Sequence, residues 1–111
     1  MNCVFCKIVN REIPADVVYE DDKIIAFKDI HPVAPVHLLI IPKAHIPSID
    51  HLETKDKTLI GELFLTAQKI AREKGVDKTG YRLTFNIGKD AGQTVDHLHL
   101  HLIGGKELPW L

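Results

Sequence analysis

A chain of 111 residues encloses one hydrophobic core and is too short for two, so we expect a single domain over residues 1–111. Its 45% hydrophobic and 26% charged residues are typical of a globular protein, and no apolar run approaches the ~20 residues that a membrane span requires. Because the formal net charge is only −1, the chain has no general attraction for polyanions, which excludes non-specific binding to nucleic acid and to an anionic membrane surface.

The first residues, Met-Asn-Cys-Val-Phe-Cys-Lys, lack the basic and long apolar regions of a secretory signal, so we expect a cytoplasmic location. Cys3 and Cys6 are too close in sequence for a disulfide that would close the fold. Their Cys-x-x-Cys spacing is typical of a metal site or of a redox dithiol. A redox dithiol usually lies at a strand-to-helix turn, and only Met1 and Asn2 precede Cys3, so the spacing favours a metal.

The hydrophobic pattern predicts five strands and one long helix. Strands are indicated over residues 17–20, 23–28, 36–41, 81–87 and 96–103. Residues 55–74 place apolar side chains at helical spacing, and Gly75 is suited to end that helix. These elements predict an α+β fold, an antiparallel sheet with a helix on one face. Leu65, off the apolar stripe of the helix, indicates a surface for self-association.

Three histidines alternate with leucines from His97 to Leu102. A strand has a side-chain period of two, so the rings of His97, His99 and His101 should share one face while the leucines pack on the other. Imidazole can act as a nucleophile towards phosphorus, a general acid or base, a donor to phosphate oxygens, or a metal ligand. The row therefore predicts either phosphoryl chemistry or a metal-hydroxide hydrolase.

A single metal ion bound by all three histidines of the row would strain the strand. The outer Cα atoms of the row are about 13 Å apart in a strand, whereas Zn–N bonds are only about 2.1 Å long, so two of the rings can share an ion but three cannot do so without strain. Better geometry is expected from Cys3, Cys6, His45 and His97, which make a tetrahedral Cys₂His₂ set. Such a set is closed, and we therefore expect a structural zinc.

The remaining histidines are not equivalent. His37 opens an apolar strand, where a lone imidazole usually has a hydrogen-bonded structural role, although the other histidines raise its chance of a functional one. His31 and His51 have loop-like surroundings, and we expect both at the surface.

Together with Asn86 and Gly92-Gln93-Thr94, the segment His-Leu-His-Leu-His-Leu-Ile resembles the signature of the histidine triad (HIT) nucleotide-binding family. The similarity covers essentially the whole chain, including Cys-Val-Phe-Cys-Lys-Ile, Ala-Phe-Lys-Asp-Ile, and Ala-Pro-Val-His-Leu-Leu-Ile-Ile-Pro-Lys-Ala-His. Gly104-Gly105 and a short tail ending in Trp110 resemble the Hint branch, purine nucleoside phosphoramidases, more than the Fhit branch of dinucleoside polyphosphate hydrolases.

The resemblance implies a HIT-like fold: a five-stranded antiparallel sheet, one long helix and a short N-terminal helix, with two chains pairing into a homodimer that has one continuous sheet. It implies cleavage of the P–N bond of a purine nucleoside phosphoramidate, with a nucleotidyl-histidine intermediate on His99. His101 and His37 would stabilise the phosphate oxygens, and the carbonyl of His97 would hold the tautomer of His99. No cofactor is needed for this chemical step.

The resemblance also implies a nucleotide site and a zinc site. Asp29 would accept the ribose hydroxyls, and an apolar slot would hold the purine, although composition alone assigns the slot residues to the core. The implied nucleotide contacts are Val4, Phe5, Ile8, Phe27, Asp29, Ile30, Asn86, Gly92, Gln93, Thr94, His99, His101 and Trp110. Cys3, Cys6, His45 and His97 match the zinc ligands of the bacterial members. Thr94 replaces a frequent serine and keeps its hydroxyl, which affects the expected rate and not the mechanism.

Two other functions are compatible with the same residues. One is hydrolysis of dinucleoside polyphosphates. The other is a nucleotide-binding regulatory module that keeps the triad but has little turnover. The sequence does not distinguish adenine from guanine, nor does it identify the physiological leaving group.

Overall fold

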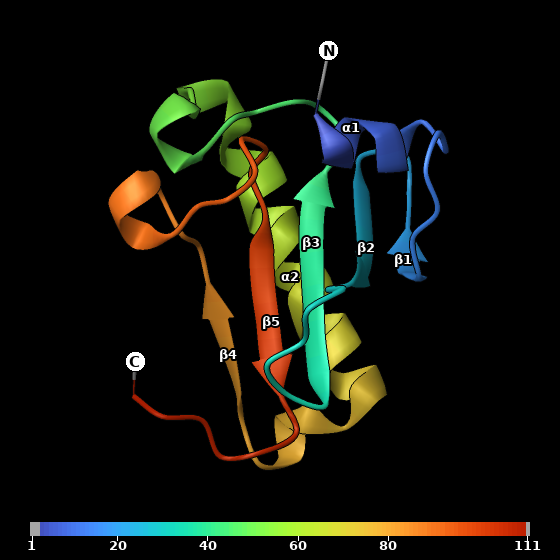
Figure 1. Ribbon diagram of the computed structural model, residues 1–111, viewed down its shortest axis with the longest axis vertical. Helices are drawn as coiled ribbons and strands as arrows, with labels where there is room; N and C mark the ends of the chain where they lie inside the picture. The colour runs from blue at the N-terminus through green and yellow to red at the C-terminus, as the bar shows by residue number, and fades with distance from the viewer. Residues whose placement is uncertain (1–2, 111) are drawn as a thin grey trace.

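Five antiparallel strands form one sheet in the order β1-β2-β3-β5-β4 (Figure 1). The computed structural model describes residues 3–110. The strands are β1 (Val17–Glu20), β2 (Ile24–Lys28), β3 (Val36–Pro42), β4 (Tyr81–Thr84) and β5 (Leu100–Gly104). The predicted α+β architecture is confirmed, with β3 and β5 at the centre and β1 and β4 at the two edges.

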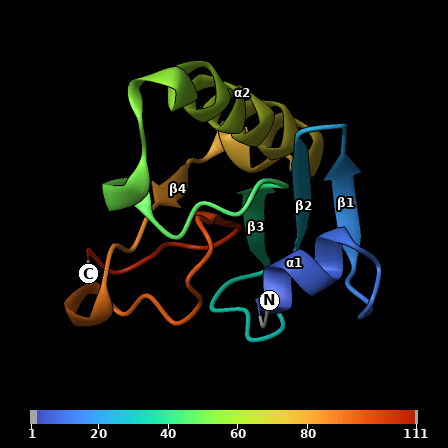
Figure 2. The ribbon, with the colours of Figure 1, turned by 90° about the horizontal axis from the view of Figure 1, so that it is seen from above.

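Two α-helices lie on opposite sides of this sheet (Figure 2). They are α1 (Val4–Val9) and α2 (Lys57–Lys74), and α2 ends at Gly75 in the left-handed conformation, with φ of 76°. The predicted helix began two residues earlier, but Thr54–Asp56 forms a 3₁₀ turn closed by a capping box with Glu53. No helix among residues 3–110 is long and apolar enough to cross a membrane.

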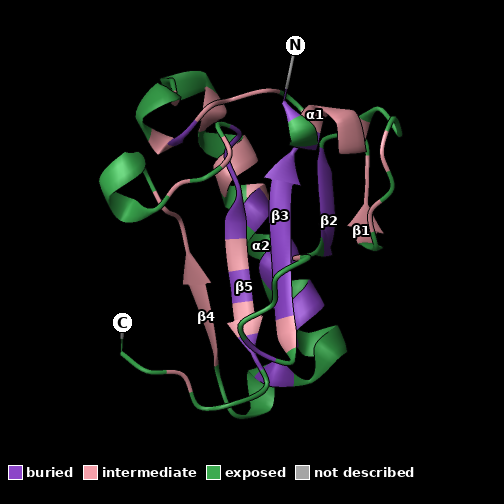
Figure 3. Cartoon of the chain, viewed as in Figure 1, coloured by how far each residue is buried: buried purple, intermediate pink, exposed green. Residues whose placement is uncertain are grey.

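The main core lies between α2 and the sheet, and β2, β3 and β5 are its most buried strands (Figure 3). Leu98, Leu100 and Leu102 all belong to this core and are at most 2% exposed, which confirms that the leucines of the histidine row face away from the rings. A smaller apolar cluster occupies the opposite face, where Phe5 of α1 covers Phe27 and Leu39. The two faces of the sheet therefore differ, because α2 fills one and the other is left for the histidines.

The last two strands are shorter than the sequence predicted. β4 ends at Thr84 instead of residue 87, and β5 begins at Leu100 instead of residue 96. The backbone N–H of Leu98 donates to the carbonyl of Ile46 at 2.6 Å, so the segment before β5 pairs with the loop after β3 and not with β4. Alternation of apolar and polar residues cannot show this, because both arrangements bury the leucines equally well.

Candidate active site and metal centre

The open face of the sheet carries a cavity of about 570 Å³ between α1, the end of β2 and the histidine row. Nine of the expected nucleotide contacts line it, namely Val4, Phe5, Ile8, Phe27, Asp29, Ile30, Thr94, His99 and His101. The apolar residues in this set form walls of the cavity, and Phe5 and Phe27 meet edge to face with ring centroids 5.4 Å apart. An aromatic and aliphatic slot that ends at two imidazoles suits a flat apolar ligand carrying a polar or anionic group.

The ring of His99 is held in one tautomer. Its Nδ1 lies 2.7 Å from the carbonyl oxygen of His97, an acceptor only, so in the neutral ring Nδ1 carries the proton and Nε2 keeps its lone pair. The ring is 7% exposed, packs edge to face against Phe5, and borders the cavity. The tautomer with the proton on Nδ1 leaves the Nε2 lone pair available at a cavity wall, which is the arrangement that a nucleophilic imidazole needs.

A second chain of hydrogen bonds sets the proton on His101. The backbone N–H of Val33 donates to Nδ1 of His37 at 3.1 Å, which leaves the single proton of neutral His37 on Nε2. That Nε2 lies 3.0 Å from Nδ1 of His101, so His101 accepts there and carries its own proton on Nε2. Burial, with the neighbouring His99 and His37, lowers the pKa of His101 to about 4. His101 is therefore a neutral donor near pH 7.

His37 itself does not line the cavity. It is 7% exposed, and its Nε2 also lies 3.3 Å from Oδ2 of Asp29. It contacts the cavity-lining residues His101, through a hydrogen bond, and Asp29. His31 and His51 are exposed, as expected.

Four other expected nucleotide contacts also lie outside the cavity. Asn86 donates to the carbonyl of Ala91 and so closes the loop after β4, and Gly92 lies in that loop with φ of 81°. The amide of Gln93 donates to the carbonyls of Pro47 and Val95, which ties the loop to the segment after β3. Trp110 is 86% exposed at the end of the described chain.

One wall of the cavity was missed by sequence reasoning. The connection from α1 to β1, residues 13–16, lines it together with Lys28, His31, Leu39 and Val95. Leu39 was detectable, because on β3 it has the same parity as His37 and pairs in register with Phe27. The connection has no such signal, since Ile-Pro-Ala-Asp has no periodicity and its one ionisable group, Asp16, belongs to no recognisable motif.

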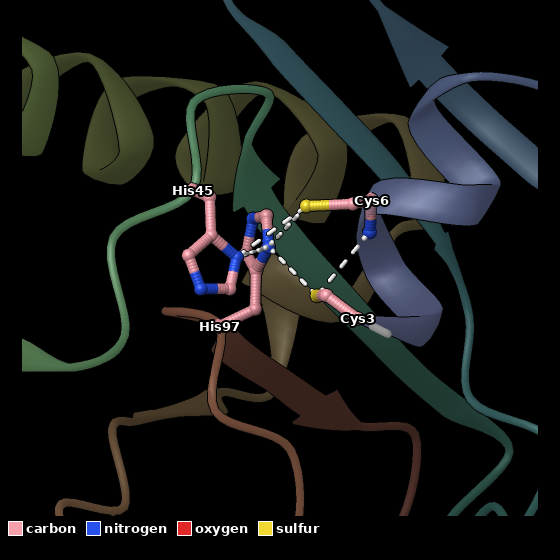
Figure 4. Close-up of side chains that lie close together, drawn as sticks. All are labelled: Cys3, Cys6, His45 and His97. Carbon is pink, nitrogen blue, oxygen red and sulfur yellow. Dashed lines mark hydrogen bonds between the residues drawn. The ribbon is translucent and has the colours of Figure 1, made fainter. Parts of the chain in front are cut away.

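Cys3, Cys6, His45 and His97 converge at the N-terminal end of α1 (Figure 4). The Sγ of Cys3 lies 3.3 Å from Nδ1 of His97, the Sγ of Cys6 lies 3.4 Å from Nδ1 of His45, and the two Nδ1 atoms are 3.3 Å apart. A tetrahedral zinc ion separates a sulfur and a nitrogen ligand by about 3.5 Å and two nitrogens by about 3.3 Å. The four ligand atoms thus have the spacing of a Cys₂His₂ site.

A hydrogen bond at Nε2 of His97 leaves its Nδ1 suited to bind a metal. Its Nε2 lies 2.8 Å from the carbonyl oxygen of Pro42, so Nε2 carries the proton and the lone pair of Nδ1 faces the thiols. Burial is the main reason that the pKa of His97 lies below its ordinary value, which keeps the ring in the neutral form that binds metals.

A second group of potential ligands, Asp29, His37 and His101, does not fit a metal. Nδ1 of His37 accepts from a backbone N–H, so a metal at Nε2 would require the ring to lose its remaining proton. The hydrogen bonds therefore indicate that these three residues fix the positions of protons and do not bind a metal.

Comparison with known proteins gives consistent results. Residues 2–109 match the family model described as "Scavenger mRNA decapping enzyme C-term binding". An uncharacterized HIT-like protein of Synechococcus elongatus is 50% identical over 107 residues, which cover 96% of this chain and 93% of that protein. The crystal structure of a HIT family hydrolase from Legionella pneumophila superposes with a TM-score of 0.96 at 50% identity and covers 98% of this chain and 97% of that one. A histidine triad nucleotide-binding protein from Candida albicans superposes with a TM-score of 0.84 at 31% identity and covers 99% of this chain and 83% of that one.

Proposed function

This chain belongs to the histidine triad (HIT) family, and on that basis we propose that it is a hydrolase that cleaves purine nucleoside phosphoramidates at the P–N bond. The observation that carries the proposal is the tautomer of His99: a backbone carbonyl holds its proton on Nδ1 and leaves the Nε2 lone pair at a cavity wall. The relatives described as a HIT family hydrolase and a histidine triad nucleotide-binding protein support the class of reaction and ligand.

The proposed reaction has two displacements at phosphorus. The Nε2 lone pair of His99 forms a bond to the α-phosphorus while the P–N bond of the substrate breaks, and the departing amine takes up one proton. Water then attacks the same phosphorus, the bond to Nε2 breaks, and one proton is released. The site returns to its starting state, with nucleoside monophosphate and amine as products. Imidazole suits both steps because it is a nucleophile when neutral and a good leaving group once attached to phosphorus.

His101 and Thr94 are the proposed donors to the phosphate oxygens. Both line the cavity, and the proton of His101 lies on Nε2, opposite the nitrogen that accepts from His37. Donors already oriented where negative charge gathers lower the barrier without further reorganisation. In this proposal His37 acts through His101, which differs from the direct phosphate contact that the resemblance implied.

Asp29 and the apolar slot are proposed to bind the nucleoside. One carboxylate oxygen of Asp29 accepts the backbone N–H of His31 at 2.8 Å, which fixes the carboxylate at the cavity edge, where it can accept hydroxyls. Phe5, Ile8 and Phe27 supply the faces for a purine. Loss of the hydroxyls would leave the carboxylate without these partners, so a ribonucleotide should bind more tightly than its 2′,3′-dideoxy analogue by about 1–3 kcal/mol.

Zinc is proposed for the Cys₂His₂ centre in a structural role. Four protein ligands complete a tetrahedral shell and leave no open position for a reacting group. Zinc would join α1 to the sheet, and the chemical step would not pass through it.

A homodimer is proposed from two exposed features. β4 is an edge of the sheet with an unpaired side, and Leu65 and Phe64 of α2 are 65% and 42% exposed. A second copy that paired β4 with β4 would extend the sheet and cover these side chains.

The decisive experiment compares turnover of adenosine phosphoramidate with that of diadenosine polyphosphates by the purified protein. We expect the phosphoramidate to have the higher kcat/KM and intact-mass analysis during turnover to detect a nucleotidyl adduct that His99→Asn does not form. Preference for the polyphosphates would instead identify a dinucleoside polyphosphate hydrolase. Tight binding without turnover of either compound would indicate a regulatory module.

A further inference from the structure

His37 Nε2 is hydrogen-bonded to one acceptor and has a second, charged one nearby. Nδ1 of His101 is 3.0 Å away and Oδ2 of Asp29 is 3.3 Å away. Because Nδ1 of His37 already accepts the N–H of Val33, the neutral ring has one proton to give. A carboxylate is a stronger acceptor than an imidazole because it is charged. The carboxylate of Asp29 therefore competes with His101 for this proton and weakens the hydrogen bond that selects the tautomer of His101.

The carboxylate of Asp29 faces both the relay and the ligand cavity. His37 and Asp29 have side chains only 6% and 18% exposed, and Asp29 lines the cavity while His37 does not. Oδ1 of Asp29 is occupied by the backbone N–H of His31, which leaves Oδ2 as the oxygen that meets His37. A hydroxyl in the cavity that donates to Asp29 therefore draws on the same negative charge and weakens the attraction of Oδ2 for the proton of His37.

We propose that Asp29 is a positioning residue as well as a binding residue: hydroxyls of the ligand draw its carboxylate away from His37 and leave the Nε2–H of His37 to His101. This inference rests on the proposed function, in which Asp29 accepts the ribose hydroxyls and His101 donates its Nε2–H to a phosphate oxygen. Once His37 donates fully to Nδ1 of His101, the proton of His101 is confined to Nε2, on the cavity side.

The consequence concerns the kind of selectivity that the site shows. If Asp29 only bound ribose, a substrate without the 2′ and 3′ hydroxyls would have a higher KM and an unchanged kcat. If Asp29 also controls His101, the same substrate reaches the chemical step before the proton of His101 is confined to Nε2, and kcat falls as well. One charge-assisted hydrogen bond corresponds to about tenfold or more in rate.

The kinetic test uses the full-length protein with adenosine phosphoramidate and its 2′,3′-dideoxy analogue. We expect wild type to lose at least about tenfold in kcat on the dideoxy compound. Asp29→Ala should raise KM for the ribose compound and make kcat nearly equal for the two substrates, because no carboxylate then competes for His37. Asp16→Ala is the matched control, since Asp16 also lines the cavity but pairs with Lys28 at 3.3 Å. It should preserve the wild-type ratio of kcat values.

A direct reading of the tautomer does not require turnover. ¹⁵N NMR of His101 should show one tautomer, protonated on Nε2, in the complex with AMP, and the pattern of the free protein in the complex with 2′,3′-dideoxy-AMP. A kcat that is indifferent to the hydroxyls, or identical His101 spectra in the two complexes, would overturn the inference. Absence of turnover together with the expected spectra would contradict the proposed reaction and leave the coupling intact, so the two failures are distinguishable.

Discussion

Removal of the metal proposed for the Cys₂His₂ centre is expected to release α1 and leave the rest of the fold in place. Cys3 and Cys6 belong to this helix or its N-cap, so the metal would join α1 to the loop after β3 and to the segment before β5. Without metal, α1 is held mainly by Phe5, whose full burial stabilises by about 1.5–3 kcal/mol. Ordering the backbone of its six residues costs about 6 kcal/mol or more. The difference of a few kcal/mol is the part that metal binding must supply.

Hydrogen exchange with and without a chelator measures this difference segment by segment. We expect the isolated protein to contain close to one zinc per chain. Chelation should remove protection from the amides of α1, lower the Tm, and spare β3, β5 and α2, which share a core without α1. Because Val4, Phe5 and Ile8 line the cavity, the Kd for AMP should rise about tenfold while some turnover persists.

Two histidine variants provide the matched comparison. His45→Ala removes one ligand and should reproduce the effect of chelation, whereas His51→Ala removes an exposed histidine bonded to Ser48 and should not. Unchanged exchange of α1 in the metal-free protein would refute the assigned role of the metal. A chelated protein that stays folded, loses all turnover and regains it with zinc would instead support a metal-hydroxide hydrolase.

Three further predictions concern single sites. His99→Ala should abolish turnover and keep nucleotide affinity within about tenfold, because only the covalent step needs its Nε2; retention of more than a few per cent of activity would contradict the nucleophile assignment. Because the pKa of His101 is lowered from 6.5 to about 4, the unfolded chain binds a proton there between these pH values and the native protein does not. The free energy of unfolding should therefore fall as pH falls from 6.5 towards 4, and urea titrations should show a smaller fall for His101→Asn. In the proposed twofold dimer the tail of each chain would lie near the site of its partner, where Trp110 would contact the leaving group. Deletion of residues 109–111, of which Leu111 lies outside the described residues, should therefore change the ranking of substrates with different amines more than it changes the Tm. A 12.5 kDa monomer by light scattering at micromolar concentration would exclude this dimer.

The parts of the fold that follow from local pattern were predictable. Alternation placed the leucines of the histidine row in the main core, and Gly75 marked the end of α2. The beginning of β5 was not predictable, because it depends on a hydrogen bond between Leu98 and Ile46, residues far apart in sequence. Strand ends are decided by such pairings, which periodicity does not record.

In the candidate site, too, local residue patterns were predictable and hydrogen-bond partners were not. Residue type and spacing identified the members of the Cys₂His₂ cluster, since thiols and imidazoles are recognisable metal ligands. The apolar walls of the cavity followed only from the resemblance, because composition alone assigned those residues to the core. Sequence reasoning did not distinguish His37, which is hydrogen-bonded to His101 and lies outside the cavity, from His101, which lines it. It also could not show that Gln93 and Asn86 bind the backbone. In a sequence, an amide side chain beside a motif looks the same whether it binds a ligand or a backbone carbonyl.

All the tautomers in the histidine row trace back to backbone groups. The carbonyls of Pro42 and His97 fix the protons of His97 and His99, and the N–H of Val33 fixes that of His101 through His37. Main-chain atoms cannot be substituted, so the protons of His97 and His99 tolerate change in the surrounding side chains, whereas that of His101 also depends on the side chain of His37. The same fact limits the transfer of the row to another protein: three grafted histidines would keep the carbonyl of His97 beside His99, but the rings of His97 and His101 would lose Pro42, His37 and Val33 and could carry their protons on either nitrogen.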